Sequence, residues 1–401
     1  MIKNKIYFAF AITLITLVNF SCDNNLKNDE SNEQTTIKAK IESENNFNES
    51  QVYISKDIYN TDIELKHEFD NAGVKNIILL IGDGMGPAQV YSGKTANKGN
   101  LFLDHFQVVG KSKTNSSDSY ITDSAAGATA FSTGEKTYNG AIGVDPDGKP
   151  LKTILEIAED NGLSTGLIAT STITHATPAS FIAHQPERSM HEEIASDFLK
   201  TDIDIFLGGG KKYFTERKDN KNLLEELKGN GYSLLSKTEE LQSDLNGKVA
   251  GLFADDAMDK YPARGEFLPT ATEKALSLLS QNEKGFFLMV EGSQIDWGGH
   301  DNDLAYVINE FNDFDRTVGV ALKFASENEG TLVIVTADHE TGGLTLVSGD
   351  LTEGKVEAKF STDYHTGIPV QVYAYGPQQS LFLGSYENTA IFSKMKEAFG
   401  F

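Results

Sequence analysis

The stretch NIILLIGDGMG, residues 76–86, is a continuous apolar run that ends in an acidic residue between glycines. An uninterrupted apolar run of this length predicts a strand buried on both faces, which is typical of a parallel sheet covered by helices. Ligands of open α/β sheets bind beyond the carboxyl ends of the strands, where Asp83 stands. The stretch therefore predicts the fold class and also a candidate metal ligand, with an Asp-capped tight turn as the alternative.

The same strand pattern recurs along the chain and alternates with amphipathic segments. The clearest helix pattern, at residues 304–325, places its apolar residues on one stripe. We expect an α/β fold in three layers, a mostly parallel central sheet with helices on both faces. Residues 211–264 are more charged and are expected to form an elaborated cap on this domain. The further strand candidates are residues 164–169, 203–207, 286–290 and 331–336.

The overall charge restricts the possible partners. The chain has 401 residues, and its 58 acidic against 35 basic residues give a formal charge of -23. A nucleic acid would be repelled by this field, so we expect no nucleic-acid partner. A small phosphorylated substrate would need local positive charge, which bound metal ions or a well-placed arginine can supply.

The N-terminus has the pattern of an export signal. Lys3 and Lys5 precede an apolar run at residues 6–18, which predicts a signal peptide over residues 1–21. The single cysteine, Cys22, follows this run and resembles a lipoprotein processing site. We expect an exported protein of the periplasm or outer membrane that is lipid-anchored at Cys22; an ordinary signal peptide with an incidental cysteine is the alternative.

Composition also divides the rest of the chain. From Cys22 the sequence is rich in Asn, Asp, Glu, Ser and Lys, which predicts a flexible tether over residues 22–70. The folded domain is expected over residues 71–401.

A hydroxyl stands at the head of a predicted small-residue helix, in the segment TDSAAGATA at residues 122–130. Helix N-termini favour anions, so Ser124 is a candidate nucleophile toward phosphorus; a helix-capping serine is the alternative. No histidine lies nearby in the sequence, so activation would have to come from a metal.

Metal-ligand residue types follow two more predicted strands. Glu291, Asp296 and His300 follow the strand at residues 286–290, and an Asp and a His four positions apart share one helical face. Asp338 and His339 follow the strand at residues 331–336, and His365 lies downstream. Mixed Asp and His ligands suit zinc, whereas oxygen ligands suit magnesium.

Taken together and in this order, these motifs resemble the alkaline phosphatase family over residues 75–401. The resemblance implies a zinc- and magnesium-dependent enzyme that hydrolyses small phosphate monoesters through a phosphoserine at Ser124, and that forms a homodimer. It implies two zinc ions and one magnesium ion. It assigns Asp296, His300 and His365 to one zinc, Asp83, Asp338 and His339 to the other with Ser124 beside it, and Thr177 and Glu291 with bridging Asp83 to magnesium; Arg188 would hold the phosphate and Asp123 would orient Arg188.

Two positions depart from the best-known bacterial pattern, which has Asp and Lys where this chain has His175 and Trp297. Other family members have His at the first position. Both residues would border the magnesium and phosphate sites; a loop hydrogen-bonding role for His175 and a packing role for Trp297 are the alternatives. At the level of function, the alternatives are a phosphodiesterase or sulfatase of the same superfamily, or a noncatalytic metal-binding surface lipoprotein.

Overall fold

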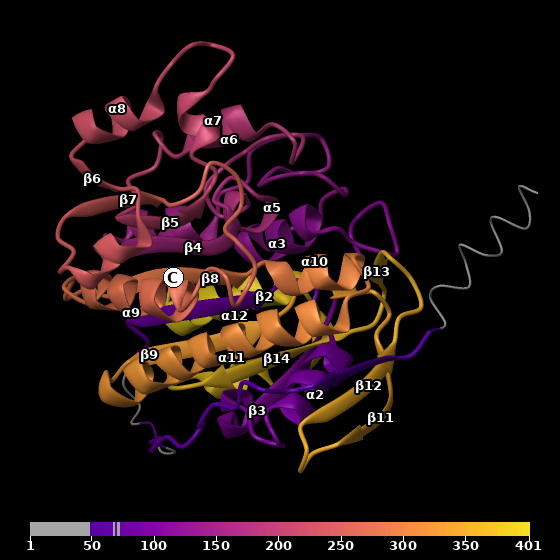
Figure 1. Cartoon of the computed structure of the whole chain (residues 1–401). Coiled ribbons are helices and arrows are strands. Elements are labelled where there is room, and N and C mark those ends of the chain that lie inside the picture. Colours follow the sequence, from indigo (N-terminus) through magenta and orange to yellow (C-terminus); the bar gives the residue numbers. More distant parts are fainter. Residues whose placement is uncertain (1–48, 67–68, 70–72) are drawn as a thin grey trace, which may run out of the picture. The chain divides into compact units, whose positions relative to one another are not determined.

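The computed structural model of the chain describes residues 49–66, 69 and 73–401, and the expected signal peptide and Cys22 lie outside them. The centre of the described part is a ten-stranded sheet with the order β15-β3-β14-β9-β2-β8-β4-β5-β7-β6 (Figure 1). Most neighbours in this sheet are parallel, whereas β14 runs opposite to β3 and β9. The predicted α/β fold with a mostly parallel sheet is therefore confirmed.

The strands are β1 Gln51–Ile54, β2 Asn76–Gly82, β3 Val108–Lys113, β4 Ser164–Thr172, β5 Ile205–Gly209, β6 Tyr232–Leu235, β7 Lys248–Leu252, β8 Phe286–Gly292, β9 Thr331–Thr336, β10 Glu340–Thr341, β11 Thr345–Asp350, β12 Lys355–Lys359, β13 His365–Thr366, β14 Val370–Tyr375 and β15 Gly384–Glu387. The α-helices are α2 Pro87–Ala96, α3 Ser124–Thr133, α4 Ile154–Asp160, α5 Ala176–Ala179, α6 His191–Asp197, α7 Lys212–Thr215, α8 Leu223–Gly229, α9 Phe267–Leu279, α10 Gln294–His300, α11 Leu304–Glu327 and α12 Thr389–Phe399. The 3-10 helices are η2 Phe102–His105, η3 Thr238–Gln242 and η4 Gln379–Phe382.

Strand β2 separates two apolar cores. Ile78 and Leu80 pack into a core with helices α9 and α11, while Ile77 and Leu79 pack into a second core with α3, α4 and α12. Alternate residues of a strand point to opposite faces of the sheet, so a strand covered on both sides must be apolar throughout. This explains why residues 77–81 are apolar without interruption.

Two segments differ from the expectations. Residues 51–54, expected within the tether, form β1, which pairs with β12 in a separate three-stranded sheet. The hydroxyl of Tyr59 donates to Asp315 on α11 at 2.7 Å, so this part of the chain packs on the domain. Residues 211–264 contribute β6 and β7, which extend the edge of the main sheet beyond β5.

The central strands all end at the same edge of the sheet. In the register, Ile81 of β2 lies opposite Glu291 of β8 and Thr336 of β9, and Ala169 of β4 also lies opposite Glu291. The residues that follow these strands must therefore meet, although they are far apart in the sequence.

Within the described residues, no helix combines the length and the hydrophobicity needed to cross a bilayer.

Candidate active site

Ser124 is the first residue of helix α3, and the helix cap is its neighbour. The Asp123 side chain accepts a hydrogen bond from the backbone N–H of Ala126 at 3.0 Å, which is the usual N-cap contact. The capping alternative for Ser124 is therefore wrong, and its hydroxyl is left for other partners. The helix lies close to the strand ends: a Cβ on Gly127 would come within 3.0 Å of the Asp338 Cβ.

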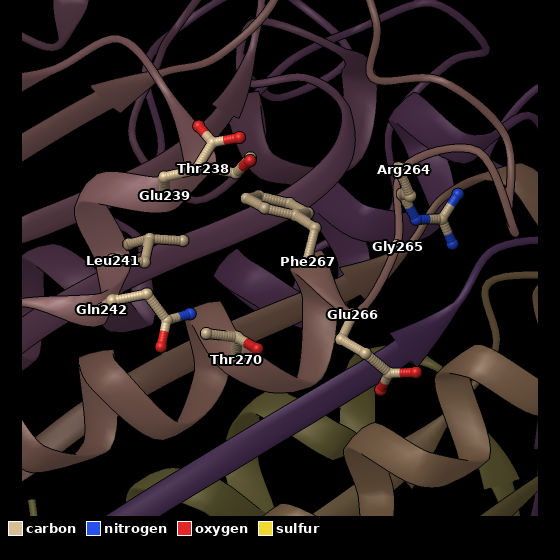
Figure 2. Close-up of a pocket in the computed structure, with 9 residues that line it drawn as sticks. All are labelled: Thr238, Glu239, Leu241, Gln242, Arg264, Gly265, Glu266, Phe267 and Thr270. Atoms are coloured by element: carbon tan, nitrogen blue, oxygen red, sulfur yellow. The ribbon is translucent and has the colours of Figure 1, made fainter.

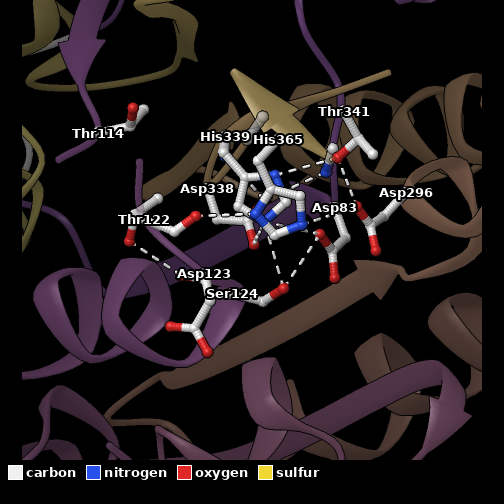
Figure 3. A network of polar contacts seen from close by, with 12 residues as sticks. Asp83, Thr114, Thr122, Asp123, Ser124, Asp296, Asp338, His339, Thr341 and His365 are labelled. Atoms are coloured by element: carbon white, nitrogen blue, oxygen red, sulfur yellow. Dashed lines mark hydrogen bonds and ion pairs between the residues drawn. The ribbon is translucent and has the colours of Figure 1, made fainter. Parts of the chain in front are cut away.

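The Ser124 hydroxyl faces a group of three buried ligand-type side chains. Its Oγ lies 3.5 Å from Oδ1 of Asp83 and 3.3 Å from Nε2 of His339 (Figure 3). Nε2 of His339 is in turn 3.2 Å from Oδ2 of Asp338 and 3.6 Å from Oδ1 of Asp83. Asp83, Asp338 and His339 each offer a ligand atom within 4.8 Å of the others. They are the residues expected at the second of the two zinc sites, so we call them the second metal group.

Asp296, His300 and His365 form a comparable set, the first metal group. Asp296 and His300 lie one turn apart on α10, as their spacing predicts. The Nδ1 atoms of His300 and His365 contact the backbone carbonyls of Asp363 at 2.6 Å and Thr122 at 2.8 Å. If each Nδ1 donates to its carbonyl, each Nε2 keeps a lone pair, as a metal ligand requires. These two Nε2 atoms lie 3.1 Å apart.

Asp83, His175 and Glu291 form the third metal group. One atom of each (Asp83 Oδ2, His175 Nδ1 and Glu291 Oε1) is buried without a hydrogen-bond partner among the described residues. Buried polar atoms are normally paired, so unpaired atoms on three residues whose ligand atoms gather within 4.8 Å fit a bound cation. Burial raises the pKa of Glu291, and the side chain of Thr177, in α5, opposes part of that rise. His175 lies with possible metal ligands and also contacts Arg188, so its metal-site role and its loop hydrogen-bonding role both stay predictions.

Arg188 lies at the edge of these groups. Its Nη1 donates to Oδ2 of Asp123 at 3.0 Å, and its Nη2 lies 3.2 Å from Nε2 of His175. Asp123 and other carboxylates raise the pKa of the guanidinium against the opposing effect of burial. The contact predicted between Asp123 and Arg188 is therefore present in the structure.

Trp297 is half-buried and meets the His175 ring edge-on, with 6.0 Å between centroids.

Buried negative charge dominates this region. Burial, with repulsion from Asp338 and other carboxylates, raises the pKa of Asp83 well above its usual range. Burial raises the pKa of Asp338 to about 6 and that of Glu291 to about 7, and it lowers the pKa of His339 well below normal. Carboxylates that are buried together, away from water, need nearby cations to stay ionised. The donor sets fit metals of the predicted kinds, two with Asp and His and one rich in oxygen.

Two residues at the site were missed from the sequence. Thr341 contacts Oδ1 of Asp296, and its hydroxyl also lies 3.2 Å from Nδ1 of His339. Its position two residues after His339, at a strand end, was the available signal. Tyr364 stacks on His365, and its adjacency to a ligand-type histidine was the signal there.

A groove elsewhere on the domain has a different character. It lies between η3 and α9, and Figure 2 shows Phe267 and Leu241 among its lining residues, with Arg264 directed away from Leu241. None of its lining residues belongs to the three metal groups. The ligand-type side chains therefore gather at the strand ends and not in this groove.

Comparisons with known proteins agree with this geometry. The family model described as "Alkaline phosphatase" matches residues 74–358. Alkaline phosphatase 4 of Bacillus subtilis (strain 168) is 42% identical, over 84% of this chain and 91% of its own length. Alkaline phosphatase of Escherichia coli (strain K12) is 34% identical, over 84% of this chain and 88% of its own. The structure of alkaline phosphatase from the Antarctic bacterium TAB5 aligns with a TM-score of 0.78 and 46% identity, over 84% of this chain and 99% of that one.

Proposed function

The chain belongs to the alkaline phosphatase family, and from this premise we propose that Ser124 is the nucleophile of an enzyme holding two zinc ions and one magnesium ion. The enzyme hydrolyses phosphate monoesters to phosphate and an alcohol, and family members act through a phosphoserine. The observation that carries the assignment is the Ser124 hydroxyl, which lies at a helix N-terminus within 3.5 Å of two members of the second metal group.

Three donor sets support the proposed metal content. The first metal group would hold one zinc, and the second metal group would hold the other. Asp83, Glu291 and Thr177 would hold magnesium, and His175, which groups with Asp83 and Glu291, would be a further ligand of the same ion. When bound, the cations would supply Lewis-acid chemistry that stabilises negative charge on phosphoryl oxygens and lowers the pKa of nearby hydroxyls.

The chain's own residues supply the attack and the positioning. Ser124 Oγ gives up its proton and forms a bond to phosphorus as the bond to the leaving oxygen breaks, and the leaving oxygen takes up a proton to become the alcohol. Water then cleaves the phosphoserine, which frees phosphate and restores the Ser124 hydroxyl. The Arg188 guanidinium is suited to holding two phosphoryl oxygens with its planar fork. Asp123 has two roles, because it caps α3 under Ser124 and also holds Arg188 in place.

His175 bears on the identity of the third ion. A structure of a TAB5 variant with a histidine replaced by aspartate is described as having Mg bound in its M3 site. In this chain His175 belongs to the third metal group, and a nitrogen ligand suits magnesium less well than a carboxylate does. We expect magnesium to bind here more weakly than it would to an all-oxygen set.

We further propose a homodimer. Tyr91 on α2, Val347 on β11 and Leu351 after it are 52%, 46% and 42% exposed and border one groove. Strand β11 is also an edge of its three-stranded sheet. Exposed apolar side chains beside an open strand edge are typical of a protein interface. Light scattering should give twice the chain mass, and Val347→Lys with Leu351→Lys should shift it toward the monomer.

The location is proposed from the sequence alone. The charged start, the apolar run at residues 6–18 and Cys22 support export and a lipid anchor in the periplasm or outer membrane. Mass spectrometry of the mature N-terminal peptide should show an acylated Cys22. Cys22→Ser should move the activity from the membrane fraction to the soluble fraction, and an unmodified cysteine in the mature protein would refute the anchor.

One preparation tests the catalytic proposal. Zinc- and magnesium-loaded protein should release phosphate from an aryl phosphate monoester much faster than it cleaves an aryl diester or an aryl sulfate. Ser124→Ala should abolish monoester turnover while zinc content stays nearly unchanged. Equal turnover by both proteins would remove the nucleophile assignment. Faster diester or sulfate cleavage would instead favour one of the alternative ester specificities.

A further inference from the structure

Three aromatic rings lie nearly parallel beside the nucleophile. The His339 and His365 rings have centroids 3.5 Å apart and an interplanar angle of 16°. The His365 and Tyr364 rings have centroids 4.5 Å apart and an angle of 4°. Exposure rises along the series, from 0% for His339 and 7% for His365 to 46% for Tyr364. The series therefore leads from the buried centre to solvent, and Tyr364 is its outer ring.

Tyr364 is held in place by its own backbone and also lies near the reacting region. Its N–H donates to the Thr362 hydroxyl at 3.1 Å, and its carbonyl accepts from the Gly342 N–H at 2.9 Å. The centroid of its ring lies 6.1 Å from that of the His300 ring and 4.5 Å from that of the His365 ring. Tyr364 therefore lies against two histidines of the first metal group.

A second exposed tyrosine borders the same loop. Tyr120 is 78% exposed and precedes the segment that leads into Ser124. A Cβ on Gly367 would come within 2.5 Å of the Tyr120 ring, so the ring lies directly against the backbone that follows His365. Two exposed aromatic side chains, Tyr120 and Tyr364, therefore lie beside the first metal group, and they come from segments that are far apart in the sequence.

The position of Ser124 bears on where the leaving group departs. Ser124 Oγ contacts Asp83 and His339 of the second metal group. In an in-line displacement the leaving oxygen departs opposite the attacking oxygen. The first metal group shares no residue with the second, and the two adjoin where the His339 and His365 rings stack. We therefore assign the leaving group to the first metal group, whose His365 lies against the exposed ring of Tyr364.

We propose that Tyr364 is a specificity-determining residue whose exposed ring packs against aromatic leaving groups, so that aryl and nucleobase-bearing phosphate monoesters are preferred. This rests on the proposed function of Ser124 and extends it to a substrate class. A phenol ring packs on another ring in offset or edge-on geometry, and such contacts add to simple apolar burial. An alkyl or sugar leaving group gains less from the same surface.

Phosphonates separate this contact from the chemistry, because their carbon–phosphorus bond is not hydrolysed. Inhibition constants for phenylphosphonate, methylphosphonate and inorganic phosphate should be measured with the metal-loaded wild type, Tyr364→Phe and Tyr364→Leu. Tyr364→Leu should weaken phenylphosphonate roughly two- to ten-fold. Its constants for methylphosphonate and phosphate should stay unchanged, and Tyr364→Phe should resemble the wild type because it keeps the ring.

Two results would overturn the inference. The first is an unchanged ratio of phenylphosphonate to methylphosphonate binding in Tyr364→Leu with full zinc content. The second is an equal loss for all three inhibitors together with lost zinc, which would show that Tyr364 only positions His365. If the Leu variant does not fold, the wild type decides, since weaker binding of phenylphosphonate than of methylphosphonate also contradicts the proposal. A wild type that turns over no monoester would instead refute the proposed function itself.

Discussion

The hydroxyl oxygen of Ser124 lies 3.3 Å from Nε2 of His339, a residue 215 positions further along the chain. In a serine–histidine–aspartate triad, a carboxylate would hold the other ring nitrogen of the histidine. Here that nitrogen faces the Thr341 hydroxyl, and the carboxylates of Asp338 and Asp83 lie near Nε2 instead. The arrangement therefore fits a metal ligand beside a nucleophile better than it fits a general base.

This relationship predicts different outcomes for two substitutions. His339→Ala should lower activity at least about 100-fold and should also remove zinc, because a ligand of the second metal group is lost. Ser124→Ala should lose activity but keep zinc. Zinc analysis beside turnover measurements checks both variants. Full zinc content in inactive His339→Ala would instead indicate a general base.

Arg188 should govern phosphate binding. Arg188→Ala should raise the inhibition constant of inorganic phosphate roughly ten- to 100-fold, the usual effect of losing hydrogen bonds to a charged group. Arg188→Lys should recover only part of this, because an ammonium cannot reproduce the planar fork. Steady-state inhibition with zinc-replete proteins is the measurement. An unchanged constant in Arg188→Ala would remove the arginine from the phosphate site.

His175→Asp should strengthen magnesium binding. The change converts the third metal group to oxygen ligands, and a carboxylate there would face Arg188 as well. We expect the magnesium concentration for half-maximal activation to fall by roughly ten-fold. Titration of metal-stripped protein with magnesium at fixed zinc checks this, with His191→Asp, a histidine outside the three groups, as the control. A higher magnesium requirement in His175→Asp would contradict the assignment.

Stability should depend on a buried ion cluster that shares no residue with the three metal groups. Arg264 contacts Glu310 at 2.5 Å and Asp313 at 2.6 Å, and the three side chains are at most 1% exposed. Arg264→Leu should destabilise the protein by about 3–5 kcal/mol, because two carboxylates stay buried without their cation. The exposed pair Lys66–Glu329 is the control, and Lys66→Ala should cost about 1 kcal/mol or less. Denaturant unfolding of both variants is the measurement.

Asp315 should make stability fall as pH rises. Burial raises its pKa to about 6, despite hydrogen bonds from Tyr59 and the backbone of Phe102 and Leu103. An unfolded Asp has a pKa of about 3.9, so between about pH 4 and pH 6 the folded state binds the extra proton. The resulting stabilisation is complete below about pH 4 and is lost as pH rises through about 6.

Asp315→Asn cannot titrate and should remove this contribution. Between about pH 4 and pH 6 the wild type should lose up to about 2–3 kcal/mol more unfolding free energy than the variant. Unfolding curves for both proteins at several pH values measure the difference. Parallel pH profiles would show that Asp315 has an ordinary pKa in the folded state.

Much of the fold and the site could be predicted from residue patterns. The strand at residues 331–336 was predicted with the bounds that β9 has, and α10 places Asp296 and His300 on one face as their spacing requires. Both depend on local periodicity. Helix α4 begins by a similarly local signal, because the capping box of Thr153 and Glu156 starts it at Ile154. The tether boundary was wrong for residues 51–54 because their pairing with β12 is invisible locally.

The sequence by itself determined the alternating α/β pattern, the ligand types at the strand ends and the serine at a predicted helix start. Tertiary structure alone decided which of those ligands share an ion, because the order β9-β2-β8-β4 and its register set their distances. It also brought Ser124 beside His339 and His365 against the carbonyl of Thr122. A chemical type is carried by each residue alone, whereas proximity across hundreds of positions exists only once the sheet has formed.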